Sequence, residues 1–161
     1  MIARRAFVIT VGGSILTALA AEAQLAGKVP RIGYLSPFSP GSESMRPMVE
    51  AFHKGLGEQG WIPSNNVTVE YRWGEEKYDR LAELAAELVR LNVDVIFTVT
   101  TQAALAAKRA TSRIPIVFTS LSDPVSAGVV AGLARPGGNV TGVGGLAPEL
   151  NGKRLELAWS Y

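Results

Sequence analysis

The chain has 161 residues, 47% of them hydrophobic, and its 16 Lys and Arg nearly balance 14 Asp and Glu, giving a formal net charge of +2. This length suits one domain with a single hydrophobic core, and the small net charge predicts no basic face for binding nucleic acid. The absence of cysteine excludes disulfides, thiolate catalysis and a lipid-anchoring cysteine, and the single histidine, His53, leaves a multi-histidine metal site without ligands. We expect no metal, no cofactor and no catalytic residue.

The first 23 residues have the pattern of a signal peptide. Arg4 and Arg5 precede an uncharged apolar run over residues 6–20, and Ala21 and Ala23 place small residues where signal peptidase cleaves. The run is shorter than the about 20 apolar residues that span a bilayer, so we expect export, cleavage near Ala23 and no stable membrane insertion afterwards. The arginine pair fits both the general secretory route and the twin-arginine route, and both stay open.

From residue 29 onward, short β-rich runs alternate with helical patterns. This order is typical of an α/β fold in which βαβ units form a parallel sheet covered by helices on both faces. Strands are expected at residues 31–35, 67–71, 93–97, 114–118 and 140–143. Apolar spacing, composition and capping signals predict helices over residues 45–59, 81–91, 101–110, 125–133 and 150–159.

The helix expected at residues 125–133 is predicted from the two residues that precede it. Asp123 and Pro124 form a strong start signal, because aspartate caps free amides and the proline ring is preorganised for the first helical position. The proline- and glycine-rich residues 135–139 predict a turn before the last strand.

Three loops are candidates for a ligand site. Ligands of an open parallel sheet bind beyond the carboxyl ends of its strands, where helix amino termini present unpaired amides. Residues 36–39, 98–102 and 119–124 meet this condition and are rich in hydroxyl groups, which suits a small polar or zwitterionic ligand. The candidate ligand-binding residues are Ser36, Phe38, Thr100, Thr101, Gln102, Ser120, Asp123 and Pro124.

These side chains allow two interpretations. Thr100 and Thr101 can bind a carboxylate beside the helix amides, and Asp123 can pair with an ammonium group. Phe38 can cover an apolar side chain of the ligand. Serine, threonine and aspartate at helix starts are also ordinary caps, and an aromatic ring in a loop can simply pack against the first helix. Both interpretations stay open.

Residues 142–147 read Gly-Val-Gly-Gly-Leu-Ala and match the dinucleotide-binding pattern G-x-G-x-x-G/A. The match follows the fifth predicted strand rather than the first, and Pro148 comes immediately after it. The acidic residue that binds the ribose about 20 positions later would lie beyond the last residue. We therefore interpret this segment as a crossover between structural units.

Several segments together support a family resemblance. They read VPRIGYLS at residues 29–36, YDRL at 78–81, IPIVF at 114–118, SDPVSAGVV at 122–130 and ARPGGNVTG at 134–142. In these segments the chain resembles the ABC transporter substrate-binding family that includes tryptophan- and other aromatic-amino-acid-binding proteins. Members of this family have the type I periplasmic-binding-protein fold, in which each lobe has a flavodoxin-like sheet.

The resemblance implies an extracytoplasmic solute-binding component of an ABC importer, located in the periplasm. Its partners would be a small amino-acid-like ligand, with aromatic amino acids included, and the transporter permease. Family members are roughly twice this length and close two lobes on the ligand. We therefore expect a signal peptide at 1–23, an amino-terminal ligand-binding lobe at 24–146, and at 147–161 the crossover and the start of a second lobe, before which the fold is truncated.

Two other functions remain as alternatives, because a fold alone does not fix a function. One is an exported enzyme on a Rossmann-like or flavodoxin-like sheet, which bound nucleotide or flavin absorbance would reveal. The other is a periplasmic sensor module, which would copurify with a kinase-like rather than a transporter-like partner.

Overall fold

The computed structural model describes residues 29–121 and 123–144. The predicted signal peptide, the segment at 147–161 and the helix expected at 150–159 lie outside these residues. Within the described ranges, no helix combines the length and the apolar character needed to cross a bilayer. The strands are β1 (Arg31–Ser36), β2 (Thr68–Trp73), β3 (Val95–Thr98), β4 (Ile116–Leu121) and β5 (Val140–Gly144).

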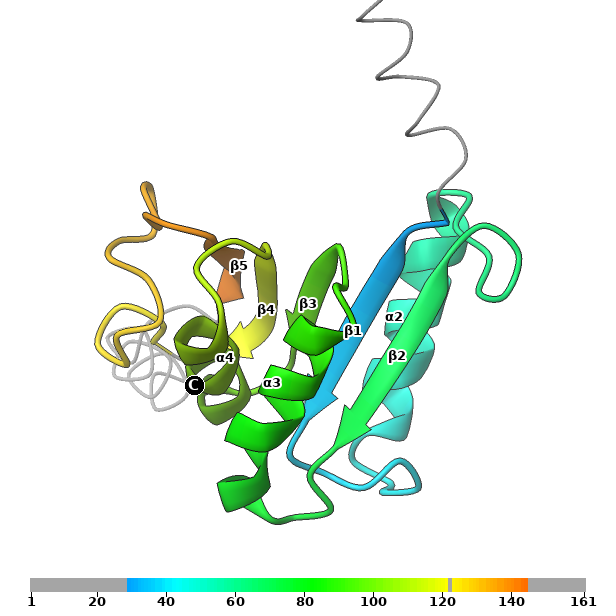
Figure 1. Ribbon diagram of the computed structural model, residues 1–161, viewed down its shortest axis with the longest axis horizontal. Helices are drawn as coiled ribbons and strands as arrows, with labels where there is room; N and C mark the ends of the chain where they lie inside the picture. The colour runs from blue at the N-terminus through cyan, green and yellow to red at the C-terminus, as the bar shows by residue number, and fades with distance from the viewer. Residues whose placement is uncertain (1–28, 122, 145–161) are drawn as a thin grey trace, which may run out of the picture.

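All neighbouring strands are parallel, and their order in the sheet is β2-β1-β3-β4-β5. This is the strand order of flavodoxin-like sheets. The chain first adds β2 on one side of β1 and then adds β3, β4 and β5 on the other side. Helices α3 (Leu81–Arg90) and α4 (Thr101–Ala110) cover one face, and α2 (Arg46–Glu58) covers the other (Figure 1). A single 3-10 turn, η1 (Tyr78–Arg80), leads into α3. The predicted α/β class with helices on both faces is confirmed.

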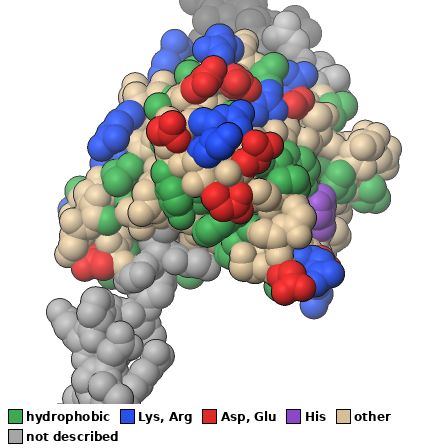
Figure 2. All heavy atoms as spheres, turned by 90° about the horizontal axis from the view of Figure 1, so that it is seen from below, with side chains coloured by type: hydrophobic (Ala, Val, Ile, Leu, Met, Phe, Trp, Pro, Cys, Tyr) green, Lys and Arg blue, Asp and Glu red, His purple; other side chains and the backbone are tan. Residues whose placement is uncertain are grey.

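Figure 2 shows the molecule from below, which is the side toward which β1 and β2 run in Figure 1. This side carries the carboxyl ends of these strands. Positive and negative side chains lie beside one another on this face, around exposed hydrophobic side chains, and the single histidine lies at one side. Ion pairs among the described residues include Arg72 with Glu87 at 2.6 Å and Arg80 with Glu75 at 3.1 Å. The described residues on this face therefore form no patch of one charge sign.

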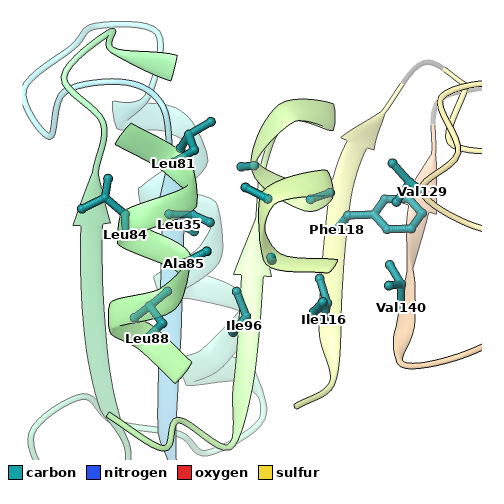
Figure 3. Close-up of a cluster of buried hydrophobic side chains, with 14 of the residues drawn as sticks. Leu35, Leu81, Leu84, Ala85, Leu88, Ile96, Ile116, Phe118, Val129 and Val140 are labelled. Atoms are coloured by element: carbon teal, nitrogen blue, oxygen red, sulfur yellow. The ribbon is translucent and has the colours of Figure 1, made fainter. Parts of the chain in front are cut away.

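The main core lies between the sheet and the α3 and α4 helices (Figure 3). Leu35 and Ile96 point from the strands toward α3, where Leu84 and Leu88 meet them, and all four are at most 4% exposed. A Cβ at Gly33 would come within 2.9 Å of the Leu88 methyl groups. The missing side chain at this position lets α3 approach β1 closely.

A second, aromatic cluster supports the α2 face. Tyr34 is fully buried, and its ring centroid lies 5.2–5.4 Å from those of Phe52, Tyr71, Trp73 and Phe97. Rings at these separations contribute more than their buried area alone. No residue of α2 is fully buried, and the helix contributes its half-buried Phe52 to this layer of rings.

The helix predicted over residues 125–133 is wrong, because the chain makes only a turn there. Asp123 does cap this turn, and the Val129 amide donates to the Pro124 carbonyl at 2.9 Å. Gly128 has φ +72, a left-handed conformation that stops helical progression. Val129 and Val130, which follow Gly128, are then buried in the main core.

Candidate functional site

The three predicted loops emerge at the same edge of the sheet. Leu35 lies opposite Thr98, and Thr98 lies opposite Phe118, so β1, β3 and β4 run side by side in one direction. Adjacent strands lie about 4.8 Å apart, which places the loops after β1 and β4 about 10 Å from each other. A small ligand can span this distance.

The first hydroxyl group of the loop after β1, that of Ser36, lies in the protein interior. Ser36 is fully buried, and its Oγ accepts a hydrogen bond from the Phe38 amide at 3.2 Å and lies 3.7 Å from Met45 Sδ. Phe38 is half-buried and packs against the aromatic cluster of Tyr34. Ser36 thus shapes the loop, and Phe38 is the partly exposed aromatic residue of this loop.

The loop after β3 joins directly to α4. Thr100 caps the helix, since its Oγ1 accepts a hydrogen bond from the Ala103 amide at 3.2 Å. Thr101, the first helical residue, is half-buried, and the first-turn amides of any helix have no partner within it. Gln102 is exposed and lines a groove of about 510 Å³ between α3 and α4, together with Tyr78 and Arg109. The Thr101 hydroxyl and the amides of Thr101 and Gln102, which precede the capped Ala103 amide, are therefore the groups available at the sheet edge.

Ser120, predicted to lie in the loop at residues 119–124, belongs to β4 in the structure, and its side chain lies outside the described part. Asp123 Oδ1 accepts hydrogen bonds from the amides of Val125 at 3.1 Å and Ser126 at 2.9 Å. Hydrogen bonds from the side chain and backbone of Ser126 lower the pKa of Asp123 below its ordinary value of 3.8. Pro124 is buried beneath this turn. Asp123 is therefore an ionised cap at neutral pH.

The lowered pKa of Asp123 predicts an acid-dependent loss of stability. A carboxyl group that is more acidic when folded stabilises the protein above its unfolded pKa, and this contribution disappears as the pH falls through the folded pKa. Asp123→Asn should lower the urea midpoint at pH 7 and remove part of the decline that occurs as the pH falls from about 5 to below 3.8. Glu50→Gln, an exposed change on α2, is the control. Equal declines in wild type and Asp123→Asn would contradict the prediction.

Two buried side-chain oxygens have no hydrogen-bond partner among the described residues: Tyr34 Oη and Thr98 Oγ1. Burial, followed by the neighbouring Tyr71, raises the pKa of Tyr34 to about 12. Tyr34 therefore stays neutral under physiological conditions. The Tyr71 hydroxyl lies 2.7 Å from His53 Nε2 and is satisfied. Nothing in the described residues explains the unpaired hydroxyl of Thr98.

Sequence reasoning missed an apolar groove of about 500 Å³ beside α2. It lies over the face of β3, β4 and β5 that α3 and α4 do not cover, and it reaches Thr119 in the predicted loop after β4. Val143, at its rim, is 73% exposed. The alternation along β4 could have revealed this groove, because Val117 and Thr119 must face opposite to the buried Ile116. Its lining comprises Pro47, Met48, Ala51, Phe52, Phe97, Val117, Phe118, Thr119 and Val143.

The glycine pattern at residues 142–147 has a packing explanation in its described part. Gly142 lies within β5 opposite Phe118, and a Cβ there would overlap the Phe118 carbonyl oxygen and ring. The glycine is thus needed for strand packing. This supports the interpretation that residues 142–144 do not form a dinucleotide site.

Comparison with known proteins identifies the family. Residues 41–158 match the family described as ABC transporter substrate binding protein. The chain belongs to this family. The resemblance inferred from the sequence segments around residues 122–130 and 134–142 is therefore confirmed.

Individual proteins that are similar to this chain agree with the family assignment. A tyrosine-binding protein of Clostridioides difficile (strain R20291) is 34% identical over 93 residues, which are 58% of this chain and 27% of the relative. An ABC domain from Streptococcus pneumonia, solved in complex with L-Trp, has a TM-score of 0.67 and 29% identity over 73% of this chain and 39% of its own. A ligand-free, open substrate binding protein from Clostridium difficile has a TM-score of 0.71 and 29% identity over 79% of this chain and 42% of its own. The chain spans less than half the length of these relatives.

Proposed function

We propose that this chain is the amino-terminal ligand-binding lobe of an extracytoplasmic substrate-binding protein of an ABC importer, and that its ligand is an aromatic amino acid. The main support is the meeting of the loops after β1, β3 and β4 at one sheet edge in a member of this family. The relatives named for tyrosine binding and for a complex with L-Trp make these two amino acids the first candidates. Residues 24–146 would form the lobe, and 147–161 the crossover and the start of the second lobe.

Each part of an amino acid has a matching group in these loops. The first-turn amides of α4 and the Thr101 hydroxyl would bind the carboxylate, because a helix amino terminus attracts anions. Asp123, ionised at neutral pH, would pair with the ammonium group. Phe38 would pack against the aromatic side chain.

The proposed activity is binding without chemical conversion. The ligand would stabilise a closed arrangement of two lobes through contacts that the open arrangement lacks, and a permease would recognise that closed form. Export by the predicted signal peptide would deliver the protein to the periplasm, where such a permease is accessible.

Binding of L-tyrosine and L-tryptophan tests this proposal. Calorimetric titration of the chain should give a saturable dissociation constant, and ligand at about 100 times that constant should add about 2.7 kcal/mol to the free energy of unfolding. Glucose and adenine are the controls and should produce no shift. Phe38→Leu should weaken binding, whereas Trp61→Leu should not, because Trp61 lies in the segment that enters β2 and therefore at the edge opposite to the loops that leave the strands. Stabilisation by adenine or glucose and not by the two amino acids would contradict the ligand assignment.

A further inference from the structure

The loop after β2 contains the most unusual backbone of the described chain. Glu75 and Glu76 have φ values of 54 and 64, so two adjacent residues with side chains adopt the left-handed conformation. Such residues are uncommon outside glycine and cost free energy that the surrounding structure must offset. Of the four non-glycine residues with positive φ in the described ranges, these are the two that are consecutive; the set is Ser64, Glu75, Glu76 and Asn92.

The strained residues bind the loop after β1. The Glu76 carboxylate accepts hydrogen bonds from the Ser39 amide at 3.1 Å and from the Ser39 hydroxyl at 2.6 Å. The Glu76 amide donates to the Pro37 carbonyl at 2.7 Å, and the Glu75 amide donates to the Phe38 carbonyl at 3.4 Å. Three successive residues of the first loop are therefore held by two residues of the second.

The preceding glycine makes this contact possible. A Cβ at Gly74 would lie 2.9 Å from the Pro37 carbonyl oxygen and 3.0 Å from Pro37 Cα. Both are backbone atoms, so the neighbour cannot yield as a flexible side chain could. The close approach at Gly74, the left-handed backbone and the two hydrogen bonds between Glu76 and Ser39 are separate features. All three join the same two loops.

The contacts that Glu75 and Glu76 make with residues 37–39 restrain the candidate residue Phe38. On one side, the Phe38 amide donates to Ser36 Oγ at 3.2 Å, and on the other, Ser39 is held by Glu76 through two hydrogen bonds. The Phe38 backbone is thus restrained from both directions while its ring remains half-buried. Restraining a binding loop before the ligand arrives reduces the entropy that binding must offset.

We infer that Glu76 is a positioning residue of the ligand site: it fixes residues 37–39 so that the Phe38 ring is preformed for the apolar side chain of the ligand. This inference rests on the proposed function. Glu76 acts through Ser39 and Phe38 and does not itself touch the ligand. Strained residues that persist at a binding loop are typical of such preorganisation.

Glu75 supplies a matched control. It has the same left-handed backbone, and its carboxylate pairs with Arg80 at 3.1 Å instead of with the loop after β1. Glu75→Ala and Glu76→Ala each remove a carboxylate from a strained position, but only the second removes the bonds to Ser39. Glu76→Gln keeps an acceptor oxygen and is the conservative variant.

The experiment measures hydrogen exchange of the Ser39 amide and the NMR shifts of the Phe38 ring in the wild-type chain and the three variants, together with calorimetric titration of L-tyrosine. Glu76→Ala should accelerate Ser39 exchange and weaken L-tyrosine binding by about fivefold to tenfold, since hydrogen bonds to charged groups are among the stronger ones. Glu75→Ala should leave the Ser39 exchange rate and the affinity for L-tyrosine within about twofold of the wild-type values. Glu76→Gln should lie between wild type and Glu76→Ala. The thermal midpoints of the two alanine variants should be similar.

Unchanged Ser39 exchange in Glu76→Ala would overturn the inference, as would equal losses of affinity in Glu75→Ala and Glu76→Ala. Failure of the wild-type chain to bind either L-tyrosine or L-tryptophan would instead overturn the proposed function. In that case, Ser39 exchange and the Phe38 shifts would still decide whether Glu76 holds the loop.

Discussion

The Gly142→Ala variant should lose about 3 kcal/mol or more of its free energy of unfolding, because the added methyl group has no space. Gly142 lies in β5 opposite Phe118 of β4, and a Cβ there would overlap both the carbonyl oxygen and the ring of Phe118. The ring belongs to the main core, and the carbonyl belongs to the strand, so neither can move away independently. Urea unfolding followed by circular dichroism measures the loss.

Gly41→Ala is the matched control for this variant. Gly41 lies in the loop before α2, a Cβ there would meet no atom within 4 Å, and its φ is not positive. Its midpoint should therefore stay close to that of the wild type or rise slightly, since alanine reduces the freedom of the unfolded chain. A Gly142→Ala variant as stable as Gly41→Ala would show that β4 and β5 do not pack as described.

The Leu88→Ala variant should lose about 3 kcal/mol, the usual cost of removing a fully buried leucine and leaving a cavity. Leu88 is 0% exposed and packs between α3 and the sheet (Figure 3). Leu133→Ala is the control, because Leu133 is 72% exposed and its removal should cost less than about 0.5 kcal/mol. The same urea unfolding experiment compares them.

A double variant tests the contact behind this prediction. Gly33→Ala alone should destabilise the chain, because its Cβ would lie 2.9 Å from two Leu88 methyl carbons. In the Leu88→Ala background those methyl carbons are absent, so adding Gly33→Ala should cost much less than in the wild type. Strict additivity of the two changes would contradict the described packing of α3 on β1.

The sheet could be predicted from sequence because its strands are short apolar runs separated by helical patterns. The helix expected at 125–133 failed for a specific reason. Asp123 and Pro124 signal where a helical turn begins, but they carry no information about its length. Gly128 ends the turn, and the burial of Val129 and Val130 in the core then decides the path of the chain. Tertiary packing thus overrode a correct local start.

The candidate site could be predicted only as a set of loops. The rule that parallel strands end at one edge correctly brought together the loops after β1, β3 and β4. It could not show that the hydroxyls of Ser36 and Thr100 are engaged within the protein, since each such bond depends on the final backbone geometry. The bond between Glu76 and Ser39 joins residues 37 positions apart and has no sequence pattern.

The fold separates the residues that hold the sheet together from those at its carboxyl edge. The close contacts of Gly33 with Leu88 and of Gly142 with Phe118 lie within strands, whereas Phe38, Thr101 and Asp123 lie in connecting segments. Under the proposed function, an exchange of a few short connections would alter recognition while the scaffold beneath them stays the same. Grafting the segments after β1, β3 and β4 from a relative with another preference is a practical route to a biosensor of altered selectivity.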